Sequence, residues 1–406
     1  MPHRPGVDRA AVRPPPRPAL RRPRPRSGGG PPRRRARRRR SPAPVPASCP
    51  PATGAPDAAA LRSALAGLPN ADATAALVRV GGTCGSLRGS AGVRDLRSGR
   101  PADPDGRFRA GSVTKVFTAA TVLQLAAEGR VDLHRPVRHY LPDLIPAGYA
   151  GVTVRQLLDH THGMPGPDLP GSTLQEWYAH RFDVHDPRAM VASATAKAPL
   201  AAPGTAQRYG NIGYTVAGLL VERVTGDTYE RQVTRRILRP LGLRDSYLPG
   251  ASPIVRGPHN RGYQAFRTPD GSTELRDVTV WGPTASWAAG DLVSTAADLE
   301  RFLLALFAGH VVPEPQLKEM FTLPVGVPGA TMSAGLQRQP LPDGRVVWLK
   351  TGARWGYSTV VAASEDGSRT LVLSVGATDA KGPVTNPVVE RVLRAAFLPE
   401  PRGAGR

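Results

Sequence analysis

Residues 108–115 read FRAGSVTK and lead directly into a segment with a clear helical period. From residue 112 to 128 the apolar residues recur every three or four positions, with Val116 and Leu123 on one stripe. Gly129 follows this stripe and is a good stop signal for a helix. The sequence therefore predicts a helix over 112–128 with a serine and a lysine in its first turn.

Ser112 and Lys115 are three positions apart, so they share one face of this helix. A serine hydroxyl is a weak nucleophile until a base takes its proton, and a desolvated lysine near other cations can act as that base. The helix N-terminus adds free N–H groups and a positive potential that favour an oxyanion. The pattern S-x-x-K is common, and alone it is better explained as a capping serine and a solvated lysine. The composition strengthens the catalytic interpretation, because only five of the 54 basic residues are lysine and arginine cannot release its proton.

A second motif, Tyr209-Gly210-Asn211, stands just before a predicted helix over 212–225. A tyrosine beside lysines can pass a proton to a leaving group, and an asparagine amide can hold a substrate carbonyl and orient the lysine. The alternative is an aromatic core residue followed by a helix cap.

The third motif, Lys350-Thr351-Gly352, lies at the end of a predicted strand over 345–350. A strand edge beside a nucleophile can align an extended acyl substrate. Lys350 adds positive charge, Thr351 offers a hydroxyl to a substrate carboxylate, and Gly352 permits close backbone approach. The N–H of Ala353 can join that of Ser112 in an oxyanion hole.

Taken together, the three motifs are far more specific than any one of them, because their order and separation match one catalytic pattern. The chain resembles the serine β-lactamase and D-alanyl-D-alanine carboxypeptidase superfamily, in the branch of class C β-lactamases, Streptomyces-type DD-peptidases and related esterases. The resemblance covers roughly residues 55–398. It is supported by FRAGSVTK and by the stretches at residues 154–163, 201–204 and 288–295.

This resemblance implies an antiparallel sheet flanked by helices, packed on a mostly helical second part, which is the β-lactamase/transpeptidase-like fold. It implies acylation of the serine, hydrolysis of the acyl-enzyme, and no metal or cofactor. The expected catalytic residues are Ser112, Lys115, Tyr209, Asn211 and Lys350. The expected substrate-binding residues are Thr351, Gly352, Ala353 and Trp287.

Two departures from the DD-peptidase pattern concern the substrate. Those enzymes read His-Thr-Gly-Thr where this chain reads Lys-Thr-Gly-Ala, and the methyl group of Ala353 cannot bind a terminal carboxylate. They also carry an arginine at about the position of Gln337, for which Arg338 or Arg354 could substitute.

We expect a serine hydrolase acting through an acyl-enzyme at Ser112, most closely a D-alanyl-D-alanine carboxypeptidase-like peptidase. One alternative is a β-lactamase or carboxylesterase of the same superfamily. Another is a non-catalytic penicillin-binding-like protein. Non-catalytic members of the superfamily lose the nucleophile or the base, and this chain keeps both. A Ser-His-Asp hydrolase would need G-x-S-x-G, and Ser112 lacks the second glycine. His160-Thr161-His162 suggests a metal site, but the aspartate of the H-x-H-x-D-H pattern is replaced by Met164.

The predicted organisation places strands at both ends of a single catalytic domain, 49–400. Its α/β part spans about 55–128 and 290–398, and a helical insertion spans about 129–289. A helix over 56–68, capped by Asp57, precedes strands at 75–80 and 86–96. Strands at 356–364 and 369–377, joined by a turn at 365–368, precede a closing helix at about 385–397.

The formal net charge of +22 is concentrated at the N-terminus. Residues 1–48 hold fifteen arginines and one acidic residue, so this stretch carries +14 and the rest of the chain +8. Its high proline and glycine content and few large apolar residues predict a disordered segment. We therefore expect a small acyl substrate as the partner, no specific nucleic acid, no membrane span and a monomer.

Two cysteines, Cys49 and Cys84, do not make a disulfide scaffold. They could form one bridge in an exported protein or remain two thiols. No signal peptide is visible, and a secreted or extracytoplasmic location rests on the resemblance alone.

Overall fold

A computed structural model describes residues 49 and 54–398. The arginine-rich segment 1–48, predicted to be disordered, lies outside the described residues. No helix in the part of the chain that the model describes has the length and apolar character needed to cross a membrane.

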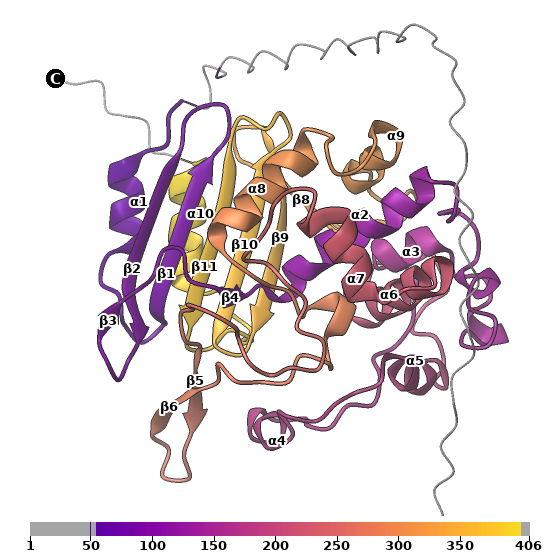
Figure 1. Cartoon of the computed structure of the whole chain (residues 1–406), viewed down its shortest axis with the longest axis horizontal. Helices are drawn as coiled ribbons and strands as arrows, with labels where there is room; N and C mark the ends of the chain where they lie inside the picture. The colour runs from indigo at the N-terminus through magenta and orange to yellow at the C-terminus, as the bar shows by residue number, and fades with distance from the viewer. Residues whose placement is uncertain (1–48, 50–53, 399–406) are drawn as a thin grey trace, which may run out of the picture. The chain divides into compact units, whose positions relative to one another are not determined.

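The central feature is a seven-stranded antiparallel sheet in the order β3-β2-β1-β11-β10-β9-β8. Its two halves come from opposite ends of the chain, because β1 pairs with β11 along its whole length, with Leu77 opposite Ser374. In Figure 1 the indigo strands of the N-terminal half lie directly beside the yellow strands of the C-terminal half. The prediction of a sheet assembled from both chain ends is therefore confirmed. The strands are β1 (Ala73–Gly81), β2 (Leu87–Asp95), β3 (Arg100–Pro101), β8 (Gln337–Pro340), β9 (Val346–Arg354), β10 (Tyr357–Ser364) and β11 (Thr370–Ala377).

Alternating apolar side chains give this sheet two buried faces. In β11, Leu371 and Leu373 pack with α1 (Ala58–Leu65) and α10 (Pro387–Phe397) on one face. Val372 belongs to the core on the opposite face, where α8 (Ala296–Phe307) crosses β1, β10 and β11. The predicted cap of the first helix is present, since the carboxylate of Asp57 accepts the N–H groups of the first turn.

The helical part lies on the side of the sheet that α8 covers. It is organised around α2 (Thr114–Ala127), which packs against α6 (Ile212–Thr225). Eleven of the fourteen residues of α2 are buried, so this helix is a core element of both parts. Four helices of this region lie in the stretch predicted as a helical insertion, and the last of them has the ends expected from the sequence, 212–225. They are α3 (Val154–Leu158), α4 (Leu174–Ala179), α5 (Pro187–Thr195) and α6 (Ile212–Thr225).

Other elements of this half were not predicted from the sequence. A hairpin of β5 (Tyr263–Arg267) and β6 (Thr273–Asp277) interrupts the region expected to be helical, and α8 lies in the second α/β part, where no helix was predicted before residue 385. The remaining elements are β4 (Phe108–Arg109), β7 (Val293–Ser294), α7 (Tyr229–Val233), α9 (Glu314–Leu317), the π-helical turn η4 (Thr234–Leu238), and the 3₁₀ turns η1 (Gly111–Val113), η2 (Val137–His139), η3 (Ala147–Tyr149), η5 (Trp287–Ala289) and η6 (Lys318–Phe321).

The two cysteines are joined in a disulfide, with their Cα atoms 4.7 Å apart. The bridge ties the segment before α1 to the connection between β1 and β2. The sequence left open one disulfide or two free thiols, and the structure contains the disulfide.

Candidate active site

The predicted helix over 112–128 begins with a 3₁₀ turn, η1, before it continues as α2. Ser112 lies in η1 with its side chain partly exposed, whereas Lys115 lies one turn further on and is completely buried. Gly111 begins the turn with φ +54°, a conformation that glycine adopts without strain. The local chain thus presents the serine to solvent and keeps the lysine beneath it.

Strand β9 passes unusually close to this turn at Gly352. A Cβ atom at that position would overlap the carbonyl oxygen of Ala110 and lie 3.0 Å from the nitrogen of Ser112. A Cβ atom on Gly111 would lie 2.6 Å from the nitrogen of Ala353. Glycine at 352 is therefore required for the approach, which brings the backbone N atoms of Ser112 and Ala353 to the same small region.

The amine of Lys115 has three polar neighbours. Its Nζ lies 3.1 Å from Ser112 Oγ, 2.8 Å from Asn211 Oδ1 and 2.8 Å from the carbonyl oxygen of Ala289. Asn211 and Ala289 present oxygens that only accept hydrogen bonds, whereas the serine hydroxyl can also donate one. The structure therefore brings the predicted serine, lysine and asparagine together.

The phenol of Tyr209 completes this arrangement. Its hydroxyl donates to Ser112 Oγ at 2.6 Å, and its ring lies 4.9 Å from the Nζ atoms of both Lys115 and Lys350. The ring also packs on that of His160, with centroids 4.6 Å apart. Tyr209 is thus hydrogen-bonded to the serine, with both lysines close to its ring.

Burial changes the acidity of both lysines. Desolvation lowers the pKa of Lys115 to about 7. It also lowers the pKa of Lys350 to about 8, where Tyr209 opposes the shift and the charge of Lys115 adds to it. Burial, with the nearby lysines, holds the pKa of His160 well below its usual value, so this imidazole is neutral at neutral pH.

A cavity of about 570 Å³ opens from Ser112 along β9 to the loop between β11 and α10. Of the predicted site residues, Ser112, Tyr209, Lys350, Thr351, Gly352 and Ala353 line it. Lys115 and Asn211 do not line it; Lys115 bonds to Ser112, and Asn211 bonds to Lys115.

Three side chains considered for substrate contact lie elsewhere. Trp287 is buried and donates its indole N–H to Glu230, so its predicted role in substrate binding has no support in the geometry. The guanidinium of Arg354 is buried too and donates to Ser286 and Gly282. Neither Arg354 nor Arg338 lines the cavity, although Gln337 does.

Two cavity walls had no signal in the sequence. One is the turn at residues 331–336 before β8, and the other is the loop at 379–386 before α10. Neither has a catalytic motif or a regular hydrophobic period, so only the tertiary fold reveals that they face the serine.

The histidine pair does not form a metal site. His160 contacts the rings of Tyr209 and Tyr214, and His162 Nδ1 accepts the N–H of Met164. Among the residues that the model describes, no group of three or more histidine, cysteine, aspartate or glutamate side chains could hold a metal ion. His160 lines the cavity beside Tyr209, and His162 is buried.

The sheet and the helical part have the fold of the serine β-lactamase and transpeptidase superfamily. The family model described as Beta-lactamase matches residues 61–392. The chain belongs to this family, whose members are serine hydrolases.

Individual relatives differ in what they act on. The structure is similar to a D-stereospecific amidohydrolase from Streptomyces sp., with 31% identity, a TM-score of 0.73, and 84% of this chain and 99% of that chain covered. It is also similar to the D-amino acid amidase from Ochrobactrum anthropi SV3 complexed with D-phenylalanine, with 26% identity, a TM-score of 0.68, and 82% and 98% covered. Penicillin-binding protein 4* from Bacillus subtilis is 27% identical over 296 residues, which are 70% of this chain and 63% of that protein. The chain thus spans less than two thirds of this curated relative.

Proposed function

We propose that the protein hydrolyses amides and short peptides of D-amino acids through an acyl-enzyme on Ser112. Lys115 is the base that activates the serine, and Tyr209 passes a proton to the leaving group. Asn211 orients the lysine, while the backbone N–H groups of Ser112 and Ala353 hold the oxyanion.

The observation that carries this proposal is the set of neighbours around the Lys115 amine. A neutral amine has two N–H donors and one lone pair. The oxygens of Asn211 and Ala289 can accept the two N–H bonds, which leaves the lone pair for the hydroxyl of Ser112. Because burial lowers the pKa of Lys115 to about 7, this neutral form is well populated at neutral pH.

The reaction follows from these positions. Ser112 Oγ attacks the acyl carbonyl carbon, its proton moves to Lys115 Nζ, and the carbonyl oxygen becomes an oxyanion. Collapse breaks the bond to the leaving nitrogen, which takes a proton through Tyr209. Water then attacks the acyl carbon and gives its proton to the same groups; the bond from the acyl carbon to Ser112 Oγ breaks, the serine oxygen regains a proton from these groups, and the free acid is released.

The charged residues that line the cavity favour a substrate whose leaving group is uncharged. Lys350 is the only lysine or arginine among the described residues that line the cavity, and Asp379 lies on a wall further along. A terminal carboxylate would gain Lys350 as a partner but neither Arg338 nor Arg354. An amide needs no such cation, and the printed names of the Streptomyces and Ochrobactrum proteins also favour D-amino acid derivatives.

A D-alanyl-D-alanine carboxypeptidase is the second candidate. It is favoured by Lys350 and Thr351, which place a cation and a hydroxyl beside the serine on the cavity wall. The two candidates differ in whether the substrate must carry a free terminal carboxylate.

We expect D-phenylalanine amide to be hydrolysed with a kcat/KM at least about 10-fold above that of a diacetyl-Lys-D-Ala-D-Ala peptide, because burying an incompletely paired carboxylate costs about 1–3 kcal/mol. Rates on both, on L-phenylalanine amide, on nitrocefin and on p-nitrophenyl acetate measure the preference directly. Faster cleavage of the D-Ala-D-Ala peptide would select the carboxypeptidase, and an equal rate on the L-amide would refute D-specificity.

The pH dependence tests the base. Below pH 7 Lys115 is protonated and has no lone pair for the serine, so kcat/KM is expected to rise about 10-fold per pH unit and to level off above an apparent pKa close to 7. Initial rates from pH 5 to 9 at low substrate concentration report this limb. A profile with no rise between pH 5 and 9 would contradict Lys115 as the base.

We further propose that the protein acts outside the cytoplasmic membrane as a monomer. The disulfide between Cys49 and Cys84 supports an oxidising compartment. One chain supplies the whole arrangement around Ser112, which supports action without a second copy.

A further inference from the structure

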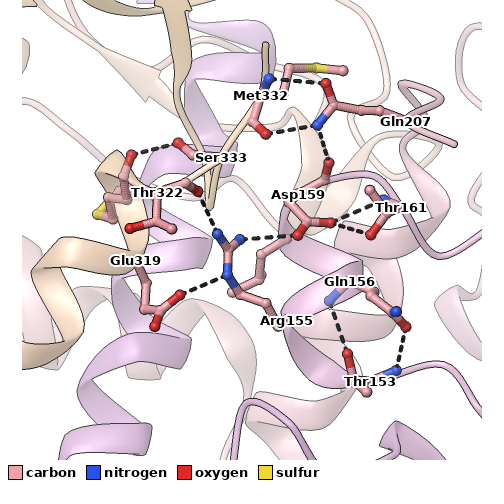
Figure 2. Close-up of polar contacts among 12 residues, drawn as sticks. Thr153, Arg155, Gln156, Asp159, Thr161, Gln207, Glu319, Thr322, Met332 and Ser333 are labelled. Carbon is pink, nitrogen blue, oxygen red and sulfur yellow. Dashed lines mark hydrogen bonds and ion pairs between the residues drawn. The ribbon is translucent and has the colours of Figure 1, made fainter. Parts of the chain in front are cut away.

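The side chain of Gln207 joins three segments that surround the candidate active site. Its Nε2 donates to the carbonyl oxygens of Asp159 and Met332, each at 2.7 Å. Its Oε1 accepts the backbone N–H groups of Thr331 at 2.9 Å and Met332 at 3.0 Å. In Figure 2 the amide lies between the Met332 backbone and Asp159.

This set of contacts uses the full hydrogen-bonding capacity of a primary amide. The group has two N–H donors and two acceptor lone pairs, and each has one backbone partner. A glutamate at position 207 would place a negative oxygen against two carbonyl oxygens. An asparagine is one methylene shorter and could not reach both sides from the same backbone.

One of the joined segments is the turn at residues 331–336, a wall of the cavity. Ser333 N–H donates to Leu336 O at 2.8 Å, and Ser333 Oγ donates to Met320 O. Gly335, with φ +87°, approaches α2 so closely that a Cβ atom there would lie 3.3 Å from the carbonyl oxygen of Lys115. The wall is therefore seated directly on the helix turn that carries the lysine.

A second joined segment supports Tyr209 from below. The Asp159 carbonyl held by Gln207 immediately precedes His160, whose ring packs on that of Tyr209. The carbonyl of His160 in turn accepts the N–H of Arg208 at 2.9 Å. Gln207 and Tyr209 are two residues apart, so the wall and the phenol are attached to the same short piece of chain.

Residues 319–322, which precede the cavity wall in the sequence, are bonded to a residue close to Asp159. Arg155 Nε donates to Glu319 Oε2 at 2.8 Å, and its Nη2 donates to the carbonyl oxygen of Thr322 at 2.6 Å. Arg155 Nη1 also forms an ion pair with Asp159 at 3.3 Å, as Figure 2 shows. The chain from 319 to 332 is thus fixed at one end by Arg155 and at the other by Gln207.

We propose that Gln207 is a positioning residue that holds the wall at 331–336 and Tyr209 in one fixed relation, and so sets the size of acyl donor that reaches Ser112. The inference rests on the proposed acyl-transfer function. It goes beyond that function because Gln207 contacts no reacting atom and acts only through the backbone of its partners.

The test is Gln207→Glu, with Gln175→Glu on the exposed face of α4 as the matched control. The variant is expected to raise KM for D-phenylalanine amide about 10-fold, which corresponds to about 1.4 kcal/mol. KM for D-alanine amide should change less than about 2-fold, because the smaller side chain tolerates a displaced wall. Labelling of Ser112 by a small fluorophosphonate should persist.

A second variant separates positioning from folding. Gln207→Met keeps the side-chain length and removes the hydrogen bonds without adding charge, and its thermal midpoint reports whether it folds. If both variants lower the midpoint but leave the ratio of the two KM values at the wild-type level, Gln207 is only structural and the proposal is overturned. If the wild type cleaves neither amide, the same comparison made with p-nitrophenyl esters of a small and a large acyl group tests the wall independently of the substrate class.

Discussion

The variant Ser112→Ala is expected to lower kcat on any cleaved substrate by at least about 10⁴-fold, because removal of a nucleophile eliminates the covalent route. Fold and binding should persist, since the serine side chain is partly exposed and its loss leaves the Lys115 bonds to Asn211 and Ala289 intact. Incubation with a fluorescent penicillin or a fluorophosphonate, followed by peptide mapping, should place the adduct on Ser112 in the wild type and give none in the variant.

The matched control is Ser63→Ala, an exposed position of α1 far along the chain from the site. It should retain both turnover and labelling. An adduct mapped to another residue, or unchanged turnover in Ser112→Ala, would remove the acyl-enzyme from the mechanism.

The variant Lys115→Arg has the second largest expected effect, a loss of about 10²–10⁴-fold in kcat. Arginine keeps the positive charge but does not release its proton at any pH of the assay, so it has no lone pair for the serine. Rate profiles from pH 5 to 9 should lose the limb near pH 7 that the wild type is expected to show.

Lys115 is completely buried, so a larger side chain could also disturb packing. The smaller variant Lys115→Ala resolves this, because it leaves space for an added primary amine. Partial recovery of turnover with methylamine would support a missing base, whereas wild-type-like activity of Lys115→Arg would refute the assignment.

The sequence predicts the motifs and the sheet because their signals are local. The helix after Ser112 has a 3.6-residue period and a terminal glycine, and the strands at both chain ends alternate or run as apolar segments. The resemblance then supplied the relation between Ser112, Tyr209 and Lys350, which no local pattern contains.

Other features were missed although local signals existed. Residues 268–272, between β5 and β6, contain Asp270-Gly271, a hairpin signal that was overlooked within a region of helices. The helix α8 has Thr295 as a capping residue with Asp298 three positions on, yet no helix was predicted between residues 290 and 345. In both cases a short local pattern differs from the structure predicted for the long region that contains it.

A third group of features depends on tertiary contacts alone. Arg354 lies two positions after Gly352 and Trp287 directly precedes the stretch 288–295, but both side chains are buried and neither lines the cavity. The wall at 331–336 is formed by backbone hydrogen bonds to Gln207, which is more than a hundred residues earlier in the chain. Proximity in sequence does not determine which way a side chain points from a strand or a loop.

The pairing of β1 with β11 has a consequence for the order in which the chain can fold. The two strands are roughly 300 residues apart, so their contacts close a very long loop and are expected to form slowly. During synthesis the helical part around α2 and α6 is complete well before β11 exists, and until then β1 has only β2 as a neighbour. A chain released before residue 370 would therefore expose one edge of β1 and the apolar face of α1. Such an edge can pair with other unfolded chains. The sheet loses this route to aggregation only when β11 has been synthesised and pairs with β1.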